Sequence, residues 1–522
     1  MSARAFFSFR RVLRGLDRRL HRGLPGRVLA LTTATAAAVL LSACIDSGGI
    51  HKKASMLDAA SLDPGAALRA TQADAQWPRG DWWRQWHDAQ LERVVADATA
   101  GNPDLQAFAA RVDAARFQTE IAGASAWPQA NVDGEFERRR YARYTTPAPP
   151  GGTTVWSNSI GATLTYDLDL WGKQRAIREG ALDRLHASAA DARFAEVELQ
   201  TGVVRAYVQL SLDYALADAY AAIQDQQRRT FDIATQRWHA GIGSRLEAAQ
   251  AQTQLSTSAT RLQRAQQQIA LDRLAIAALA GQGPGYGDAL ARPTLALSVP
   301  LALPSALPAE LVGHRADVVA ARWRVLASEQ GIDAAHADFY PDINLLATAS
   351  LGSAATFGGF FNFVNSDGVG HGVGAAISLP IFDGGRRRGQ YGVAVSSRDA
   401  AVDAYNRTVI DAMRDVAAQA ISLRALDEQQ ASTEATLDAA RTAYRLADEG
   451  YRSGISEFLN VLAAQNAQLL QEQSLALVQA QRLDAWAQLM RALGGGYVGE
   501  ATAANGAPTA PTAQGANDAA RN

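Results

Sequence analysis

The sequence predicts an α+β membrane protein in which long helices alternate with short strands and several chains share one β-barrel. Three observations lead to this prediction. The body of the chain is two copies of one unit, each copy holds two alternating strands, and each copy holds an unusually long proline-free helical stretch. With 522 residues, 48% hydrophobic and 20% charged, the composition is that of a folded protein and not of a disordered one.

The N-terminus predicts a signal peptide over residues 1–43. Eight arginines and one acid, Asp17, give this stretch a charge of about +7. The apolar run from Val28 to Leu41 is shorter than the ~20 residues that a spanning helix needs. The whole chain has a formal net charge of -2, so the chain after residue 43 is acidic. It therefore has no basic surface of the kind that binds nucleic acid.

Cys44 is the expected site of lipid attachment. Leu41-Ser42-Ala43-Cys44 resembles a bacterial lipobox, and Cys44 is the only cysteine of the chain. No disulfide within the chain and no cysteine metal cluster can form. Ile45 follows the cysteine, where an aspartate commonly retains lipoproteins at the inner membrane, so the outer membrane is favoured.

The duplication follows from four pairs of residues that are all 213 positions apart. They are Asp104 and Asp317, Pro128 and Pro341, Gly172 and Gly385, and Gly241 and Gly454. Four anchors at one offset indicate two copies of one unit. We expect a lipidated N-terminal segment over 44–87, a first repeat over 88–285, a linker over 286–308, a second repeat over 309–496 and a disordered tail over 497–522.

Each copy begins with a helix and continues into two strands. In the first copy we expect a helix from about Asp88 to Ala126, a strand from about Gln129, a loop over 144–154 and a second strand. One face of that second strand is apolar: Ile160, Ala162, Leu164, Tyr166, Leu168 and Leu170. The second copy repeats the pattern with Ile343, Leu345, Ala347, Ala349 and Leu351, and then with Val373, Ala375, Ile377, Leu379 and Ile381. Strands of this length with one apolar face are typical of membrane barrels.

Long helices follow the strands in both copies. No proline occurs over 173–239 or 386–452, and a helix of that length would run ~100 Å. An apolar stripe at heptad spacing indicates coiled-coil packing: Val402, Tyr405, Val409, Met413, Val416, Ala420 and Leu423. Turns at Gly241 and Gly454 should end the long helices, and return helices should follow over 244–280 and 456–493.

Four strands in one chain cannot close a membrane barrel. An open sheet edge in lipid would leave backbone groups unpaired, so several chains must share the barrel. Three chains would supply twelve strands. The unpaired edges require an oligomer, and they do not by themselves require three chains.

The chain resembles the outer-membrane efflux protein family, in its lipoprotein branch of TolC-like outer-membrane factors. The matching segments are Asn102-Pro103-Asp104-Leu105, Tyr166 to Gly172, His314 to Val318, Phe339-Tyr340-Pro341, Ile381 to Arg386, Tyr451 to Gly454 and Ala492 to Gly496. The resemblance implies a homotrimer with a twelve-stranded barrel in the outer membrane and a helical tunnel through the periplasm. It also implies a periplasmic adaptor protein and an inner-membrane drug pump, of the proton-driven RND type, as partners, with no cofactor and no metal.

The resemblance suggests where the periplasmic gate lies. Gly241 and Gly454 should form the tip, and Leu459 matches an apolar ring of related proteins. The related carboxylate position holds Ala463 here, which is a departure from the family pattern. Glu457 and Glu247 are substitute candidates, and helix capping or a solvated surface is the alternative role for either.

A second group of candidates marks the junction of strands and helices. It comprises Pro128, Pro341, Trp171, Gly172 and Gly385. Proline opposes helix continuation, which suits a change from helix to strand. Trp127, Tyr340 and Phe382 join Trp171 as an expected aromatic belt at the inner lipid boundary. The Gly- and Pro-rich stretch over 281–308 and the segment over 45–76 are expected to wrap the waist of the tunnel.

Other classes of protein fit the sequence less well. The eight histidines are scattered, and no His-Glu-x-x-His motif, nucleophile elbow or phosphate loop accompanies them, so an enzyme is not expected. A structural coiled-coil lipoprotein would not need alternating strands, and a periplasmic adaptor would have one hairpin. The outer-membrane duct of a type I protein secretion system has the same architecture and remains the alternative to small-molecule efflux.

Overall fold

A computed structural model describes residues 49–63, 65–69, 77–146, 151–295, 307–355 and 368–498. The described chain forms two compact units. Within the described ranges, the first unit holds residues 49–52, 123–177 and 329–397, and the second holds 53–122, 178–328 and 398–498. The predicted signal peptide, Cys44 and the tail from residue 499 lie outside the described residues.

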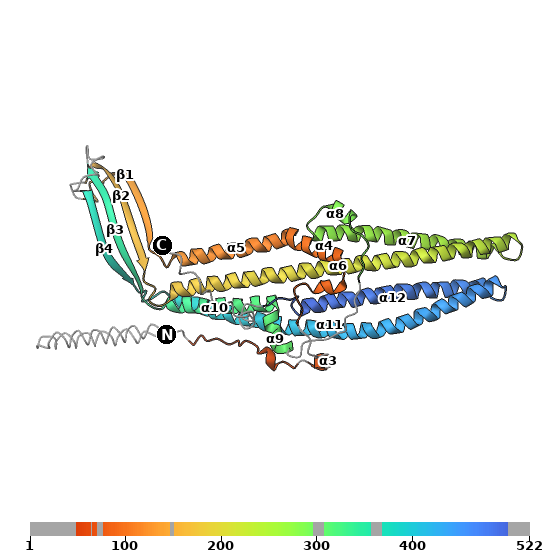
Figure 1. The fold of residues 1–522 in the computed structure, drawn as a ribbon. Helices are drawn as coiled ribbons and strands as arrows, with labels where there is room; N and C mark the ends of the chain where they lie inside the picture. Colours follow the sequence, from red (N-terminus) through yellow and green to blue (C-terminus); the bar gives the residue numbers. More distant parts are fainter. Residues whose placement is uncertain are drawn as a thin grey trace, which may run out of the picture. The chain divides into compact units, whose positions relative to one another are not determined.

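The first unit contains one antiparallel sheet, with strands in the order β1-β2-β3-β4 (Figure 1). The strands are β1 (Gln129–Arg140), β2 (Thr154–Asp167), β3 (Asp342–Ala355) and β4 (Val369–Ser378). In the register, Leu164 pairs with Ala130 on one side and with Ala347 on the other, and Ala347 in turn pairs with Val373. The apolar residues predicted for one face therefore lie side by side across all four strands, because side chains alternate along a strand.

The prediction of four strands is confirmed, but the ends of two strands were predicted too late. β2 stops at Asp167 and β4 stops at Ser378, so Leu168, Leu170, Leu379 and Ile381 lie outside the strands. The reason is visible after β2. Asp169 accepts hydrogen bonds from the backbone N–H groups of Gln174 (3.0 Å) and Arg175 (2.8 Å), and so begins the next helix instead of extending the sheet.

Helices account for nearly all the remaining structure. The short ones are η1 (Ala59–Ser61), α3 (Gly65–Arg69), η2 (Trp82–Trp86), α8 (Pro284–Asp288) and α9 (Leu307–His314). The longer ones are α4 (Ala89–Gly101), α5 (Pro103–Ala124), α6 (Lys173–His239), α7 (Arg245–Leu279), α10 (Ala316–Ala337), α11 (Arg386–Arg452) and α12 (Phe458–Ala492). The long helices α6 and α11 have 67 residues each and coincide with the predicted ranges.

The helix predicted from Asp88 to Ala126 is interrupted once. Asn102 has an extended backbone between α4 and α5, and its side-chain oxygen accepts a hydrogen bond from the N–H of Asp104 at 2.8 Å. Pro103 follows as the first residue of α5, where its missing N–H costs nothing. The prediction of one continuous helix was therefore wrong at Asn102, although the start signal there was visible in the sequence.

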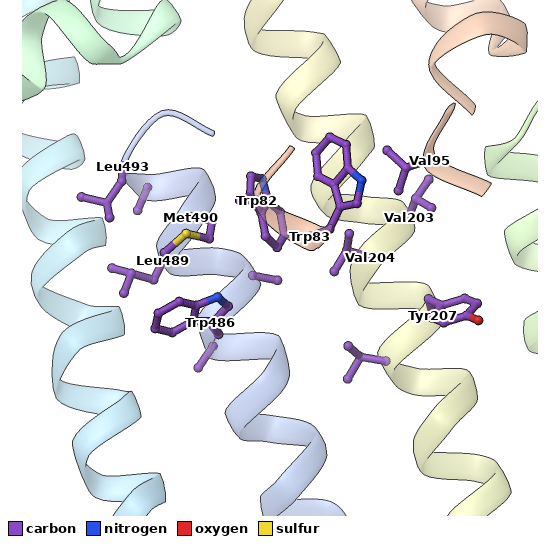
Figure 2. Close-up of a cluster of buried hydrophobic side chains, with 14 of the residues drawn as sticks. Trp82, Trp83, Val95, Val203, Val204, Tyr207, Trp486, Leu489, Met490 and Leu493 are labelled. Carbon is purple, nitrogen blue, oxygen red and sulfur yellow. The ribbon is translucent and has the colours of Figure 1, made fainter. Parts of the chain in front are cut away.

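The hydrophobic core of the second unit joins helices from both copies. Figure 2 shows Trp82 and Trp83 of η2 between Val203 and Val204 of α6 and Trp486 of α12. All seven residues of the predicted heptad stripe on α11 are buried, with Val402, Val416 and Ala420 fully so. The stripe thus holds helices together, as coiled-coil spacing predicts.

The two copies also share their closing contacts. Asn102 donates from Nδ2 to the carbonyl of Leu279 at 2.9 Å, and Arg315, 213 residues later, donates from Nη1 to the carbonyl of Ala492 at 3.2 Å. In both copies a side chain at the start of one helix thereby satisfies a carbonyl at the end of the return helix. The duplication is therefore a repetition of contacts as well as of residue types.

The segment before η1 lies along α11. The carboxylate of Asp399 accepts hydrogen bonds from the N–H groups of Lys53 and Ala54, and Asn406 accepts one from the N–H of Leu57 at 2.7 Å. Residues 53–57 therefore lie against α11, and the expected wrap of residues 45–76 around the helices stays a prediction.

Candidate functional site

The two helix turns have the same backbone geometry. Gly241 has φ +75° and Gly454 has φ +74°, a left-handed conformation that glycine adopts without strain. After Gly241, the N–H groups of Ile242 and Gly243 donate to the carbonyl of Arg237, both at 3.0 Å. After Gly454, the next two N–H groups donate to the carbonyl of Gly450, at 2.8 and 3.1 Å. Each glycine thus ends a long helix and reverses the chain.

A buried cluster behind the turns brings the two hairpins together. Tyr451 of α11 is 3% exposed, and its ring lies 4.8 Å from the guanidinium of Arg237 of α6. The Tyr451 hydroxyl donates to Oε2 of Glu247 of α7 at 3.3 Å, and its ring packs on Phe458 of α12 at 5.3 Å. Burial and the neighbouring Glu247 carboxylate raise the pKa of Tyr451. Tyr451 therefore contacts all three other long helices at this end of the second unit.

The predicted gate candidates differ in their surroundings. Leu459 is 64% exposed, and its equivalent Leu246 in the first copy is 66% exposed. Ala463 is exposed as well, one turn further along α12. Glu247 is half-buried and accepts a hydrogen bond from the Tyr451 hydroxyl. Glu457 is exposed at the N-cap position of α12, and its side chain makes no capping hydrogen bond.

Sequence reasoning missed three residues at the turns. Leu246 could have been found by applying the 213-residue offset to Leu459. Tyr451 and Arg237 could not, because the residues at the same offset are Trp238 and Gly450. Their contact joins unlike positions of the two copies, so neither copy predicts it alone.

The predicted junction residues all belong to the first unit, and Trp171 contacts Pro341 there. The Trp171 ring stacks on Tyr340 at 4.6 Å, and its Nε1 donates to the carbonyl of Pro341 at 2.7 Å. Gly172 has φ +75° and Gly385 has φ +89°. Pro128 directly precedes β1 and Pro341 directly precedes β3. Of the expected aromatic belt, Trp127 and Phe382 are 73% and 90% exposed.

Charged side chains fix the starts of the two long helices at this junction. Asp383 accepts hydrogen bonds from the N–H groups of Gly385 and Arg387 at the start of α11, and it also pairs with the Arg387 side chain at 2.8 Å. That pairing lowers the pKa of Asp383. Lys173, at the start of α6, pairs with Asp338 at 2.7 Å. These contacts cap and tie down the first turns of α11 and α6.

Nothing in the described part of the chain suggests a metal centre: no group of three or more His, Cys, Asp or Glu side chains could bind an ion there. Among those residues, no helix is both long and apolar enough to cross a membrane.

A profile of the family described as outer membrane efflux protein matches the chain twice, over residues 94–282 and over residues 307–495. The two matches fall on the two copies. The chain belongs to the outer membrane efflux protein family.

Curated relatives carry names from drug and toxin resistance. The chain is 44% identical to the fusaric acid resistance protein FusA of Burkholderia cepacia over 69% of this chain and 68% of that protein. It is 28% identical to the multidrug resistance outer membrane protein MdtP of Escherichia coli K12 over 81% of this chain and 88% of that protein. The chain is accordingly an outer-membrane protein of an efflux family.

Solved structures have the same fold. The outer membrane protein VceC of Vibrio cholerae is 30% identical, with a TM-score of 0.75 over 80% of this chain and 100% of that chain. The outer-membrane channel OprN is 25% identical, with a TM-score of 0.76 over 86% of this chain and 99% of that chain. The fold is therefore that of outer-membrane channels of this family.

Proposed function

We propose that three copies of the chain form the outer-membrane conduit of a tripartite efflux system. The strands of three copies would close a twelve-stranded barrel, and the helices would line a tunnel through the periplasm. The conduit would receive small molecules from an inner-membrane pump, of the RND type, through a periplasmic adaptor. Cys44 would carry a lipid that anchors each copy.

The open sheet supports the shared barrel. β1 and β4 are the edge strands, and no other strand of the described chain pairs with their outer edges. Every residue of β4 is exposed, and so is nearly every residue of β1. Apolar side chains such as Val132 (72% exposed) and Val373 (90%) stand on the face expected to meet lipid. Since lipid tolerates no unpaired strand edge, neighbouring copies must supply the missing partners.

The observation that carries the proposal is a difference in burial between equivalent helix faces. Val197 and Val208 of α6 are 9% and 3% exposed within the chain. Their equivalents on α11, Ile410 and Ile421, are 53% and 55% exposed. The same positions are thus covered in one copy and bare in the other, although the side chains on α11 are larger.

The helix before each sheet repeats this difference. In α10, Ala320 and Ala327 are buried, whereas their equivalents in α5, Ala107 and Ala114, are exposed. Indeed α5 has no buried residue, although an apolar stripe at heptad spacing runs along its exposed side: Ala107, Ala110, Ala114, Phe117 and Ile121. Within one chain, the equivalent faces of α10 and α6 are already covered. In a closed ring of copies, α5 of one chain and α11 of the next would be covered in the same way, at the contact between the copies.

Small molecules are favoured as cargo over secreted proteins. FusA and MdtP are named for resistance to fusaric acid and to multiple drugs, and both align with most of this chain. The outer-membrane duct of a type I protein secretion system is the alternative. The identity of the adaptor and pump that bind the chain would distinguish small-molecule efflux from protein secretion.

The test is photo-crosslinking in cells from a probe at Ile242 or Ile455, which are 68% and 87% exposed on the two turns. Capture of a periplasmic adaptor is expected, and the pump that co-purifies with it should be a drug pump. A probe at Phe136, equally exposed on β1, is the control and should not capture the adaptor. Capture of no envelope protein from either turn, with the protein in the outer membrane, would contradict the proposal.

A further inference from the structure

Two acids face each other in the interior of the α6–α7 hairpin. Asp213 of α6 is 6% exposed and Asp272 of α7 is 9% exposed, and Asp213 is among the groups that raise the pKa of Asp272. Gln209 donates to Oδ2 of Asp213 and Gln268 donates to Oδ1 of Asp272, each at 2.9 Å and each from the preceding turn of the same helix. No N–H or O–H group of the described chain reaches Oδ2 of Asp272. Two carboxylates only accept, so a bond between them needs a proton.

The cations nearby contact groups other than the two acids. Arg273, the next residue of α7, donates from Nη2 to the Tyr214 hydroxyl at 2.6 Å, and its buried Nε has no partner in the described part of the chain. Arg292 pairs with Asp218 at 2.5 Å. Further along the same helices and their neighbours, Arg205 of α6 pairs with Asp484 of α12, and Asp97 of α4 accepts from the Tyr286 hydroxyl of α8. None of these cations pairs with the two acids, and burial together with Asp213 raises the pKa of Asp272 to about 7.

The second copy shows that the fold does not require these acids. At the same 213-residue offset it has Leu426 for Asp213 and Ala485 for Asp272. Ala485 is buried and Leu426 packs against the core, so the equivalent positions on α11 and α12 are apolar. Burying a charge is costly where an apolar pair would serve. An acid pair in one hairpin alone is therefore a feature beyond packing.

We propose that Asp213 and Asp272 form a proton-operated contact between α6 and α7, which is closed when the pair holds one proton and loosened when both carboxylates ionise. The periplasm is open to external pH, so this contact would make one of the two hairpins in each copy respond to it. The inference concerns the helical wall of the proposed conduit and rests on that function only for its physiological meaning.

The direction of the pH effect follows from the raised pKa. An acid with a pKa of about 7 in the folded chain and about 3.8 when unfolded stabilises the contact below pH 3.8, and this contribution is lost as pH rises through about 7. The hairpin should therefore be tighter in mild acid than in mild alkali.

The experiment is hydrogen exchange on the purified full-length protein at about pH 5.5 and about pH 8.5, corrected for intrinsic rates. After this correction, peptides covering 209–216 and 268–276 should exchange about tenfold faster at the higher pH than at the lower pH. Peptides covering 422–429 and 481–489, in the second copy, are the internal control and should show no such change. Asp272→Asn keeps a donor to Asp213 and cannot titrate, so its first-copy peptides should stay protected at both values.

A second variant distinguishes loss of the pH response from loss of the fold. Asp213→Leu with Asp272→Ala gives the first hairpin the residues of the second, and the pH response should disappear while the hairpin stays protected. In the wild type, an infrared band of a protonated buried carboxyl should titrate near pH 7 and be absent from Asp272→Asn. A pH response that survives in Asp272→Asn, or its absence from the wild type, would overturn the proposal. Adaptor capture would be unaffected, so the proposed efflux function would stand.

Discussion

At the start of α4, one carboxylate connects three separate parts of the second unit. Asp88 is 4% exposed and accepts hydrogen bonds from the N–H groups of Gln90 and Leu91, from the Tyr207 hydroxyl at 3.1 Å and from the N–H of Thr294 at 2.7 Å. Burial alone would raise the pKa of Asp88, but these bonds lower it below 3.8. Asp88 therefore stabilises the fold above that pH, and the contribution is lost as pH falls through the lowered pKa.

Asp88→Asn should lower the free energy of unfolding by about 1–3 kcal/mol at neutral pH, because the amide nitrogen cannot accept from Tyr207 or Thr294. The variant should also lose part of the wild-type decline in stability below pH 4. Thermal unfolding of detergent-purified protein across pH tests both effects. Asp81→Asn is the control, because Asp81 makes only an exposed ion pair with Arg84 at 3.2 Å. Equal losses in the two variants would refute this account of Asp88.

Gly494 shows a different constraint on a single residue. It has φ +93°, and a Cβ there would lie 1.8 Å from the carbonyl oxygen of His314. Gly494→Ala should therefore lower the free energy of unfolding by at least about 1–3 kcal/mol, the cost of one strained backbone conformation. Gly202→Ala, inside α6 with open space around its Cβ, should instead be neutral or stabilise by up to about 1 kcal/mol. Comparing the unfolding temperatures of both variants with the wild type checks the prediction, and a harmless Gly494→Ala would contradict it.

Among the secondary-structure elements, α11 is stabilised by the packing of its buried stripe and not by helix propensity alone. Leu423 is 3% exposed within the stripe, whereas Leu446 on the same helix is 56% exposed. Leu423→Ala should cost about 2–5 kcal/mol, because it removes packed atoms and leaves a cavity. Leu446→Ala should cost less than about 1 kcal/mol in chemical denaturation of the purified protein. A similar loss in both variants would mean that the stripe is not the core of this helix.

Elements were predictable from sequence where one periodic pattern ran unbroken. The long helices lie where the proline-free stretches over 173–239 and 386–452 predicted them, because a glycine stands close to each end: Gly172, Gly241, Gly385 and Gly454. The strand ends after Asp167 and Ser378 were missed, because the alternation of apolar residues continues past the point where Asp169 starts a helix. The acid pair of Asp213 and Asp272 was missed as well, although the two residues are 28 positions before Gly241 and 29 positions after Gly243, so the predicted hairpin already places them opposite each other. The sequence does not show that both side chains are buried.

For the whole molecule, the two copies within a chain serve as a template for contacts between chains. Ile410 and Ile421 are half exposed where Val197 and Val208 are buried, so the next copy should cover them. Ile421→Asp would place a charge in that contact and should dissociate the trimer, because a buried unpaired charge is strongly unfavourable. Light scattering with detergent correction should then give the mass of one chain, 55.5 kDa for the full sequence, instead of three.

Gln429→Asp, two turns further along the same helix at an exposed polar position, adds the same charge and should leave the trimer intact. Circular dichroism should show unchanged helix content in both variants, because Ile421 is 55% exposed within its own chain. If Ile421→Asp stayed trimeric, the exposed faces of α11 and α5 would have to meet something other than a second copy. The bare apolar side of α5 would then need a different covering, and the closed ring would lose its strongest support.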